Sequence, residues 1–180
     1  KNSQYTKLET TCYAPTIMGP FHYLPFLECN HAIISLRHHI TGSLKVNNQK
    51  FQIISDGYIE KDWGRSFPQD YLWLQSNSCK EKEASLFLSI AKIPLLACSF
   101  QGLIMNLLVD DQQIRVATYY GARVKDMFTR EGYHYLIISQ HPHTFYLKIK
   151  AGHRFELKSP QSGKMNGYVE ESLNALAVLL

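Results

Sequence analysis

The sequence predicts an all-β protein of antiparallel strands, arranged as a barrel or a sandwich. Hydrophobic residues alternate with a period of two, not 3.6, from His31 to Lys150, and the span has no amphipathic helical stretch. Turn-forming residues separate these strands at intervals of roughly 8–12 residues, which is typical of sandwiches and barrels. Aromatic residues make up 12% of the 180 residues, with 11 Tyr and 9 Phe, and they favour strands over helical bundles.

The expected strands follow one another from residue 32. The first covers 32–40 and ends at Thr41-Gly42, and a hairpin turn follows at Asn47-Asn48, because Asn tolerates the positive φ of tight turns. Asp56-Gly57 and the segment 110–113 are predicted to be further turns. The other expected strands are 44–46, 51–53, 58–63, 71–77, 85–93, 100–109, 114–120, 133–140 and 144–150.

The two ends of the chain differ from this pattern. Residues 1–25 contain three prolines and are predicted to form an irregular lead-in or linker, with the β domain at 26–180. The segment 169–180 is ambiguous, since its composition also permits a helix. The chain begins with Lys1, so we expect the C-terminal part of a longer protein.

Composition excludes several classes of protein. With 45% hydrophobic and 19% charged residues the chain is not disordered, and a net charge of +4 spread along the sequence does not favour a nucleic-acid partner. The four cysteines form no C-x-x-C pair and are expected to be reduced thiols in a cytoplasmic protein. The motifs of phosphate-binding loops, zinc proteases and serine hydrolases are missing. We expect no metal and no cofactor, whereas contact with a membrane surface and the oligomeric state stay open.

Two carboxylates share one face of the expected strand 58–63. Alternation places Tyr58, Glu60 and Asp62 on one face, with Trp63 on the other. If their face is solvated, the acids are an ordinary charged exterior. If it lines a cavity, repulsion and desolvation raise one pKa and create a proton donor near neutral pH.

The expected strand 71–77 has an unusual face of two aromatic side chains and two amides. Tyr71, Trp73, Gln75 and Asn77 point one way, which suits a pocket that holds an apolar ligand and hydrogen-bonds its polar end. The alternative is an exposed surface, with the intervening leucines in the core. Farther upstream, Glu28 and His31 form a pair that could support acid–base chemistry.

These segments resemble the tocopherol cyclase family, specifically its bacterial members. The most specific block is 57–77, which reads GYIEKDWG, SFP and YLWLQSN, and it is joined by GPF at 19–21 and PFLECNH at 25–31. Weaker similarity follows at 89–94, 117–121 and 159–165. The resemblance implies a lipocalin-like β architecture in which this chain is one half of a two-barrel protein.

The resemblance also implies a reaction, the proton-initiated ring closure of a prenylated quinol without a redox cofactor. The catalytic candidates are Asp62, Glu60 and His31, with Asp62 preferred as the acid because it adjoins Trp63-Gly64 at a possible cavity mouth. The candidate substrate-binding residues are Trp63, Tyr71, Trp73, Gln75, Asn77 and Glu28. Two alternatives stay open: a non-catalytic carrier of an apolar ligand, and a hydratase in which water captures the cation.

Overall fold

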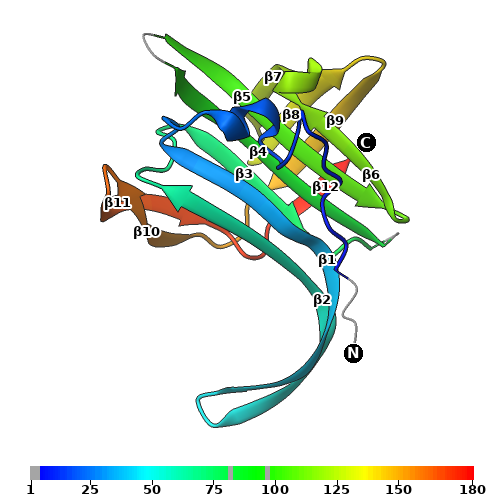
Figure 1. The fold of residues 1–180 in the computed structure, drawn as a ribbon. Helices are drawn as coiled ribbons and strands as arrows, with labels where there is room; N and C mark the ends of the chain where they lie inside the picture. The colour runs from blue at the N-terminus through cyan, green and yellow to red at the C-terminus, as the bar shows by residue number, and fades with distance from the viewer. Residues whose placement is uncertain (1–4, 81–82, 96–97) are drawn as a thin grey trace.

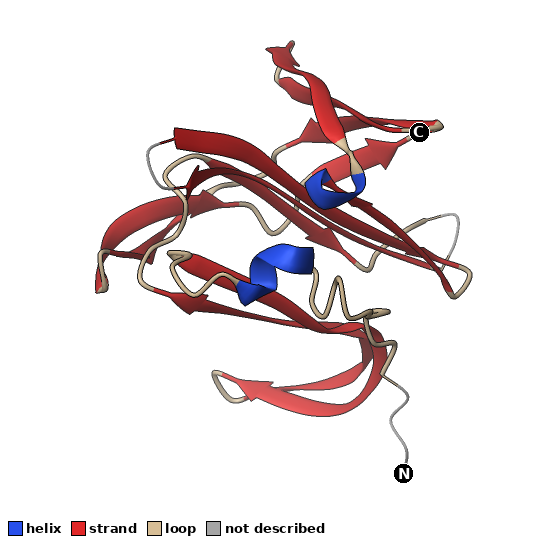
Figure 2. Cartoon of the chain, turned by 45° about the horizontal axis from the view of Figure 1, so that its top comes forward, coloured by secondary structure: helices blue, strands red, loops and turns tan. Residues whose placement is uncertain are grey.

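The computed structural model describes residues 5–80, 83–95 and 98–180 and confirms the all-β class (Figures 1 and 2). All strand pairs in these residues are antiparallel, and the helices are two short 3-10 turns, η1 (Gly19–Tyr23) and η2 (Thr118–Tyr120). The strands are β1 (Cys29–Val46), β2 (Gln49–Gly64), β3 (Tyr71–Ser76), β4 (Ala84–Leu95), β5 (Cys98–Val109), β6 (Gln112–Ala117), β7 (Arg123–Arg130), β8 (Tyr133–Gln140), β9 (His143–Lys150), β10 (Phe155–Gln161), β11 (Lys164–Glu171) and β12 (Leu176–Leu179).

The strands form four sheets, and the described residues do not close into a barrel. Two sheets have four strands each, in the orders β3-β4-β5-β6 and β12-β9-β8-β7. The other two are the hairpins β1-β2 and β10-β11. Strand β3 is therefore an edge of its sheet, beside the β1-β2 hairpin (Figure 1).

The β3-β6 sheet is the central layer, because each of its faces contributes to a separate hydrophobic core. One face packs on the β7-β9 sheet through residues such as Leu88, Met105, Leu136 and Ile138. The other face carries Phe87 and Leu108, which pack against β1 and the N-terminal segment; the rest of this second core is Leu8, Ile17, Ile33 and Leu36. Leu72 and Leu74 of β3 pack against the first of these cores, and this burial fixes the position of β3 and of its opposite, polar face.

Two of the predicted turns are wrong. Gly42 and Gly57 both lie within strands, paired with Ile53 and His38, so β1 and β2 form one long hairpin. The irregularities of this hairpin are two register shifts in β1 between Ile33 and His38, within the segment that was expected to be a regular strand. The side chain of Asp56 accepts hydrogen bonds from Arg37, which holds a turn-forming residue inside a strand.

Two other predicted turns are confirmed, and the structure shows that the ambiguous C-terminal segment is not a helix. Asn47 and Asn48 have φ values of 47° and 68°, and Asp110 and Asp111 have 48° and 65°, so both turns form as predicted. The ambiguous segment 169–180 is extended, because β11 continues to Glu171 and β12 pairs with β9. Cross-strand hydrogen bonding therefore overrides the helical propensity there.

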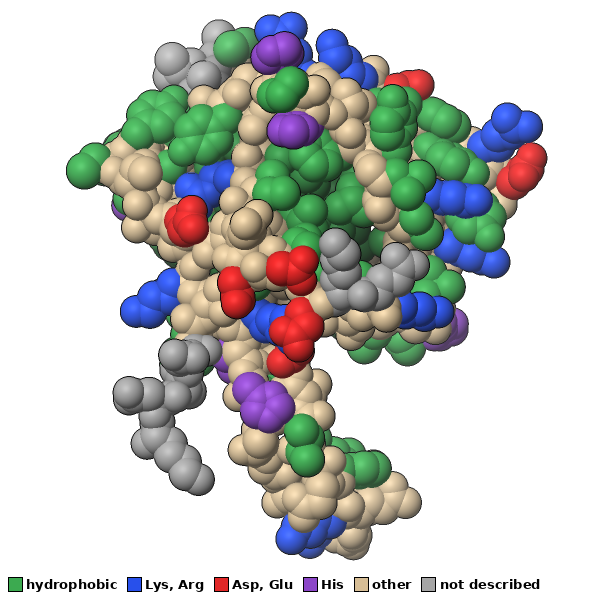
Figure 3. Space-filling view, turned by 90° about the vertical axis from the view of Figure 1, so that its right-hand side faces the viewer, with side chains coloured by type: hydrophobic (Ala, Val, Ile, Leu, Met, Phe, Trp, Pro, Cys, Tyr) green, Lys and Arg blue, Asp and Glu red, His purple; other side chains and the backbone are tan. Residues whose placement is uncertain are grey.

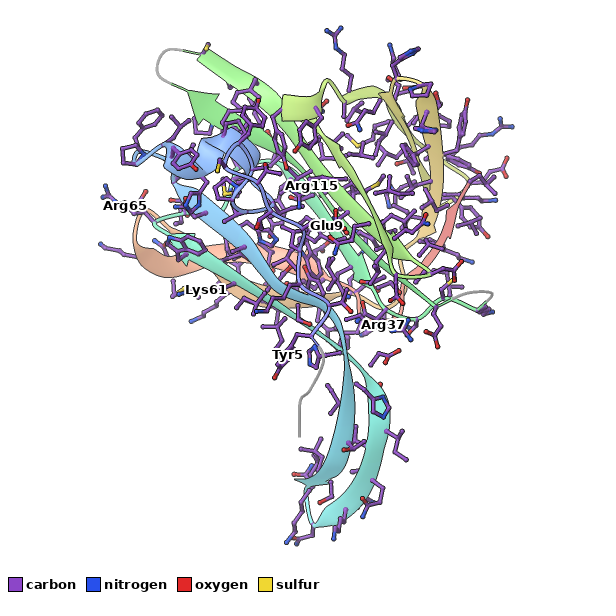
Figure 4. The ribbon with its side chains drawn as sticks, turned by 45° about the vertical axis from the view of Figure 1, so that its right-hand side comes forward. Tyr5, Glu9, Arg37, Lys61, Arg65 and Arg115 are labelled. Atoms are coloured by element: carbon purple, nitrogen blue, oxygen red, sulfur yellow. The ribbon has the colours of Figure 1, made fainter. Side chains whose placement is uncertain are left out.

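The described part of the lead-in, 5–25, has irregular backbone but packs against the body; residues 1–4 lie outside the described residues. Ile17 is fully buried, and the Arg115 side chain donates to the carbonyl of Glu9, which lies beside it in Figure 4. Gln113 exchanges two further hydrogen bonds with this segment, donating to Lys7 and accepting from Glu9. The segment thus covers part of the central sheet.

One buried amide gives a first prediction about stability. Asn106 is fully buried on β5, and neither amide atom hydrogen-bonds to a described residue. A buried unsatisfied polar group costs about 1–3 kcal/mol. We expect Asn106→Leu to leave the free energy of unfolding unchanged or raise it by about 1 kcal/mol, measured by urea denaturation. A loss of more than about 2 kcal/mol would show that the amide is satisfied in solution.

Candidate functional site

The acidic face of β2 lines a cavity. Of the two alternatives, a solvated exterior and a cavity wall, the structure therefore has the second. Tyr58, Glu60 and Asp62 are among the residues that line it, whereas the intervening Ile59 and Lys61 are not. The cavity measures about 2600 Å³ and its wall is mostly apolar. Both faces of β3 contribute to the wall, so the cavity reaches around the edge of the central sheet.

His31 joins the two carboxylates from the neighbouring strand. It is paired with Asp62 in the β1-β2 register, and its Nδ1 lies 2.5 Å from Asp62 Oδ1. Its Nε2 lies 3.6 Å from Glu60 Oε2. Each ring nitrogen of this histidine therefore faces a different carboxylate.

The His31 ring is held from a third direction by the central sheet. Phe87 of β4 stacks on it, with ring centroids 4.8 Å apart and an interplanar angle of 11°. The backbone N–H of His31 is directed at the Met18 sulfur, 3.1 Å away. Only 12% of the His31 side chain is exposed.

Glu60 is a carboxylate held among hydrogen-bond donors but largely removed from solvent. Tyr58 donates its hydroxyl to Glu60 Oε2 at 2.6 Å, and the Trp73 side chain also acts on the pKa of this carboxylate. Burial raises the pKa of Glu60 above its ordinary value, and the nearby Asp62 adds to this effect. The Tyr58 hydrogen bond, His31 and Trp73 act in the opposite direction, but burial prevails.

The two carboxylates differ in exposure. The Asp62 side chain is 33% exposed and that of Glu60 is 20% exposed. The neighbouring thiol shows how strongly this end of the site disfavours negative charge: burial, with the Asp62 charge, raises the pKa of Cys29 to about 11. Burial also raises the pKa of Tyr58.

The aromatic and amide face of β3 points toward the same cavity, and Leu72 and Leu74 of its other face pack on the main core. Gln75 donates to Asn77 Oδ1 at 2.8 Å, and Ser85 donates to the same oxygen at 2.7 Å. Asn77 in turn donates to the carbonyl of Gly57 at 2.9 Å. The Asn77 side chain thus ties β3 to β2.

Of the predicted binding residues Trp63 and Glu28, only Glu28 lines the cavity. Trp63 is on the opposite face of β2, with Lys61 Nζ 5.5 Å from its ring centroid, and it is not among the described residues that line the cavity. The pairing is regular from Ile33 to Cys29, so no bulge turns Trp63 inward. Glu28 lines the cavity, and its carbonyl accepts the backbone N–H groups of Arg65 and Ser66.

Gly64 closes this end of the hairpin. Its φ is 153°, and a Cβ at this position would overlap the Glu28 carbonyl. Only glycine permits this approach of the two strands. The position lies two residues after Asp62, so it helps to keep the His31–Asp62 pair in register.

Sequence reasoning did not assign roles to two residues of this cluster. Tyr58 shares the predicted face of Glu60 and Asp62, and this shared face is the signal by which it could have been found. Phe87 carries no such signal, because it is an ordinary apolar residue of a strand until the structure places it on His31.

His31, Glu60 and Asp62 also form a group with the geometry to bind a metal ion, since one ligand atom from each lies within 4.8 Å of the others. An imidazole bonds a metal through one nitrogen, and here both nitrogens already face carboxylates. The same arrangement suits proton transfer between the three groups.

The fold and the cluster together define an antiparallel β protein with a carboxylate–histidine group on the wall of a large, mostly apolar cavity. Residues 6–93 match the family described as tocopherol cyclase-like. The match confirms the resemblance over this range, which contains the whole cluster from His31 to Phe87, and assigns this part of the chain to that family. No curated protein and no solved structure matches the chain. No helix in the described residues is long and apolar enough to span a membrane.

Proposed function

We propose that the protein is an intramolecular cyclase that closes a ring on a prenylated quinol or a similar apolar substrate. The observation that carries the proposal is a carboxyl group of raised pKa, Glu60, on the wall of a mostly apolar cavity within the family-matched segment. The cavity takes the prenyl chain, and the reaction requires neither an oxidant nor a reductant.

Glu60 supplies the proton. A protonated carboxyl transfers its proton to one carbon of a trisubstituted alkene and leaves a tertiary cation on the other carbon. Its raised pKa keeps more of the group protonated near neutral pH than an ordinary glutamate would be. The environment thus favours Glu60 as the acid over the more exposed Asp62, which the sequence preferred.

His31 accepts the proton that the phenol releases. The phenol oxygen bonds to the cation and loses its proton, so the product is an isomer of the substrate. Asp62 holds Nδ1 and leaves Nε2 as the acceptor. Transfer of this proton from Nε2 to Glu60, 3.6 Å away, restores the site.

The remaining predicted residues bind and orient the substrate. Tyr71 and Trp73 present aromatic faces that stabilise a cation, and Gln75 and Glu28 offer polar groups to the quinol. Asn77, already bonded to Gly57, acts by holding β3 against β2.

The reaction is tested by incubating the protein with a prenylated quinol in D₂O under a reducing, oxygen-free atmosphere. Ring closure places one solvent deuterium on carbon, so the chromanol product is one mass unit heavier than the product formed in H₂O. A hydratase would add the elements of water as well, and a carrier would leave the substrate unchanged. Either of these results contradicts the cyclase proposal and selects an alternative.

Ligand binding provides a separate prediction, which does not depend on turnover. An apolar fluorophore should brighten on binding to the cavity, and the prenylated quinol should displace it, because the wall combines apolar area with amide donors. Trp73→Ala should weaken quinol binding by up to roughly tenfold, since a contact between aromatic rings contributes about 0.5–1.5 kcal/mol. Trp63→Ala is the matched control and should have no effect. Equal effects of the two substitutions would contradict a site on the β3 face.

A further inference from the structure

The outer half of the β1-β2 hairpin extends away from the body of the protein. We call residues 40–55 the arm; Figures 1 and 3 show it beyond the sheets, and its two strands pair continuously from Ile40–Ser55 to Val46–Gln49. Arg37 lies where the arm leaves the body (Figure 4), bound to Asp56 and Glu83. The arm is thus a regular hairpin anchored at its base.

The register gives the arm one apolar face. Residues directly opposite each other in an antiparallel pair point to the same side. The apolar face contains Ile40, Leu44, Val46, Phe51 and Ile53, and the first four are between 38% and 50% exposed; its other members are Gly42, Gln49 and Ser55. The other face carries Thr41, Ser43, Lys45, Lys50 and Gln52, with Ile54 as its one large apolar residue.

The charge of the arm has a single sign. Lys45 and Lys50 lie directly opposite each other near the tip, and residues 40–55 contain neither Asp nor Glu. Like charges in this position destabilise a hairpin. An anionic partner would relieve the repulsion between Lys45 and Lys50. The arm of a second copy could not do so, because it has no carboxylate to pair with these lysines.

We propose that the arm docks on an anionic lipid bilayer, with its apolar face in the interface and its two lysines at the level of the phosphates. This is the combination by which peripheral proteins bind membranes: apolar area on one face, cations on the opposite, polar face and low net hydrophobicity. The proposal rests on the arm alone and is independent of the reaction proposed above.

Vesicle co-sedimentation of the 180-residue chain tests the proposal. Binding should be weak on phosphatidylcholine vesicles, strong when about a third of the lipid is phosphatidylglycerol, and reduced by high salt. Lys45→Gln/Lys50→Gln should weaken the binding to anionic vesicles by more than tenfold, at about fivefold for each lysine. The matched control, Lys158→Gln/Lys164→Gln, removes two exposed lysines from the β10-β11 hairpin and should reduce binding much less.

Two further variants test the apolar face. Leu44→Ser/Phe51→Ser should lose binding to anionic vesicles while keeping the wild-type circular dichroism, because neither residue belongs to a hydrophobic core. The emission of Phe51→Trp should shift to shorter wavelength when anionic vesicles are added, by more than that of the wild type.

Three results would overturn the proposal. The first is a wild-type chain that binds no vesicles, and the second is equal binding by the arm variants and the wild type. The third is a wild-type dimer in light scattering that the Leu44/Phe51 variant converts to a monomer without any change in vesicle binding, which would make a second copy the occupant of the arm.

Discussion

Replacement of Glu60 by glutamine is expected to lower the rate of ring closure by about 10²–10⁴-fold, the usual contribution of a general acid. The amide keeps the shape of the side chain and can still accept a hydrogen bond from Tyr58, but it has no proton of suitable acidity. Quinol affinity, measured by displacement of the fluorophore, should change by only a few-fold.

Asp62→Asn is the matched comparison, because the two acids lie on the same face of one strand. The Asp62 carboxylate contacts His31 and is not the proposed donor of the proton to the alkene. We therefore expect a smaller loss of rate than for Glu60→Gln. A larger loss in Asp62→Asn would restore Asp62 as the acid. Wild-type rates in both variants would exclude both carboxylates, and loss of turnover on addition of a chelator would point to a metal ion instead.

The raised pKa of Glu60 also fixes the sign of two pH effects. The rate should fall as pH rises through this pKa, because the acid form is the donor. Stability depends on pH because the pKa of Glu60 is higher in the folded protein than in the unfolded chain. Between these two pKa values the folded protein binds more protons, so the contribution of protonated Glu60 to the free energy of unfolding is lost as pH rises from the unfolded to the folded pKa. At neutral pH, Glu60→Gln should therefore be at least as stable as the wild type while being far less active.

The face of the acids could be predicted from sequence because it depends only on local alternation. The strand is regular over 58–63, so period two places Tyr58, Glu60 and Asp62 on one face, and the structure shows that this face lines the cavity. The same rule placed Trp63 on the opposite face, where the structure has it.

The partner of His31 could not be predicted in this way. The Asn47-Asn48 turn alone would set His31 opposite Gly64, and the two register shifts in β1 move its partner by two residues to Asp62. A shift of two keeps each side chain on its original face, and the acids thereby meet the imidazole. The shifts depend on how β1 bends over the central sheet, which local sequence does not encode.

Phe87 links the stability of the fold to the geometry of the site, and its removal should have the largest effect on stability. The side chain is fully buried in the second core and its ring stacks on His31. Phe87→Ala removes a whole aromatic ring, so we expect a loss of about 3–5 kcal/mol in the free energy of unfolding. Phe87→Leu retains much of the buried area and should be far less destabilised, but it removes the flat surface that fixes the imidazole.

The control is Leu88→Ala, the neighbouring residue on the opposite face of β4, which is equally buried but belongs to the other core. It should lose about 2–5 kcal/mol in urea denaturation without lowering the rate of ring closure per folded molecule. Phe87→Leu should do the reverse, with a small loss of stability and a lower rate of ring closure, because the stacked ring keeps Nδ1 and Nε2 directed at Asp62 and Glu60. If Phe87→Leu leaves the rate of ring closure unchanged, the two carboxylates alone are sufficient to orient His31, and Phe87 serves only to fill the core.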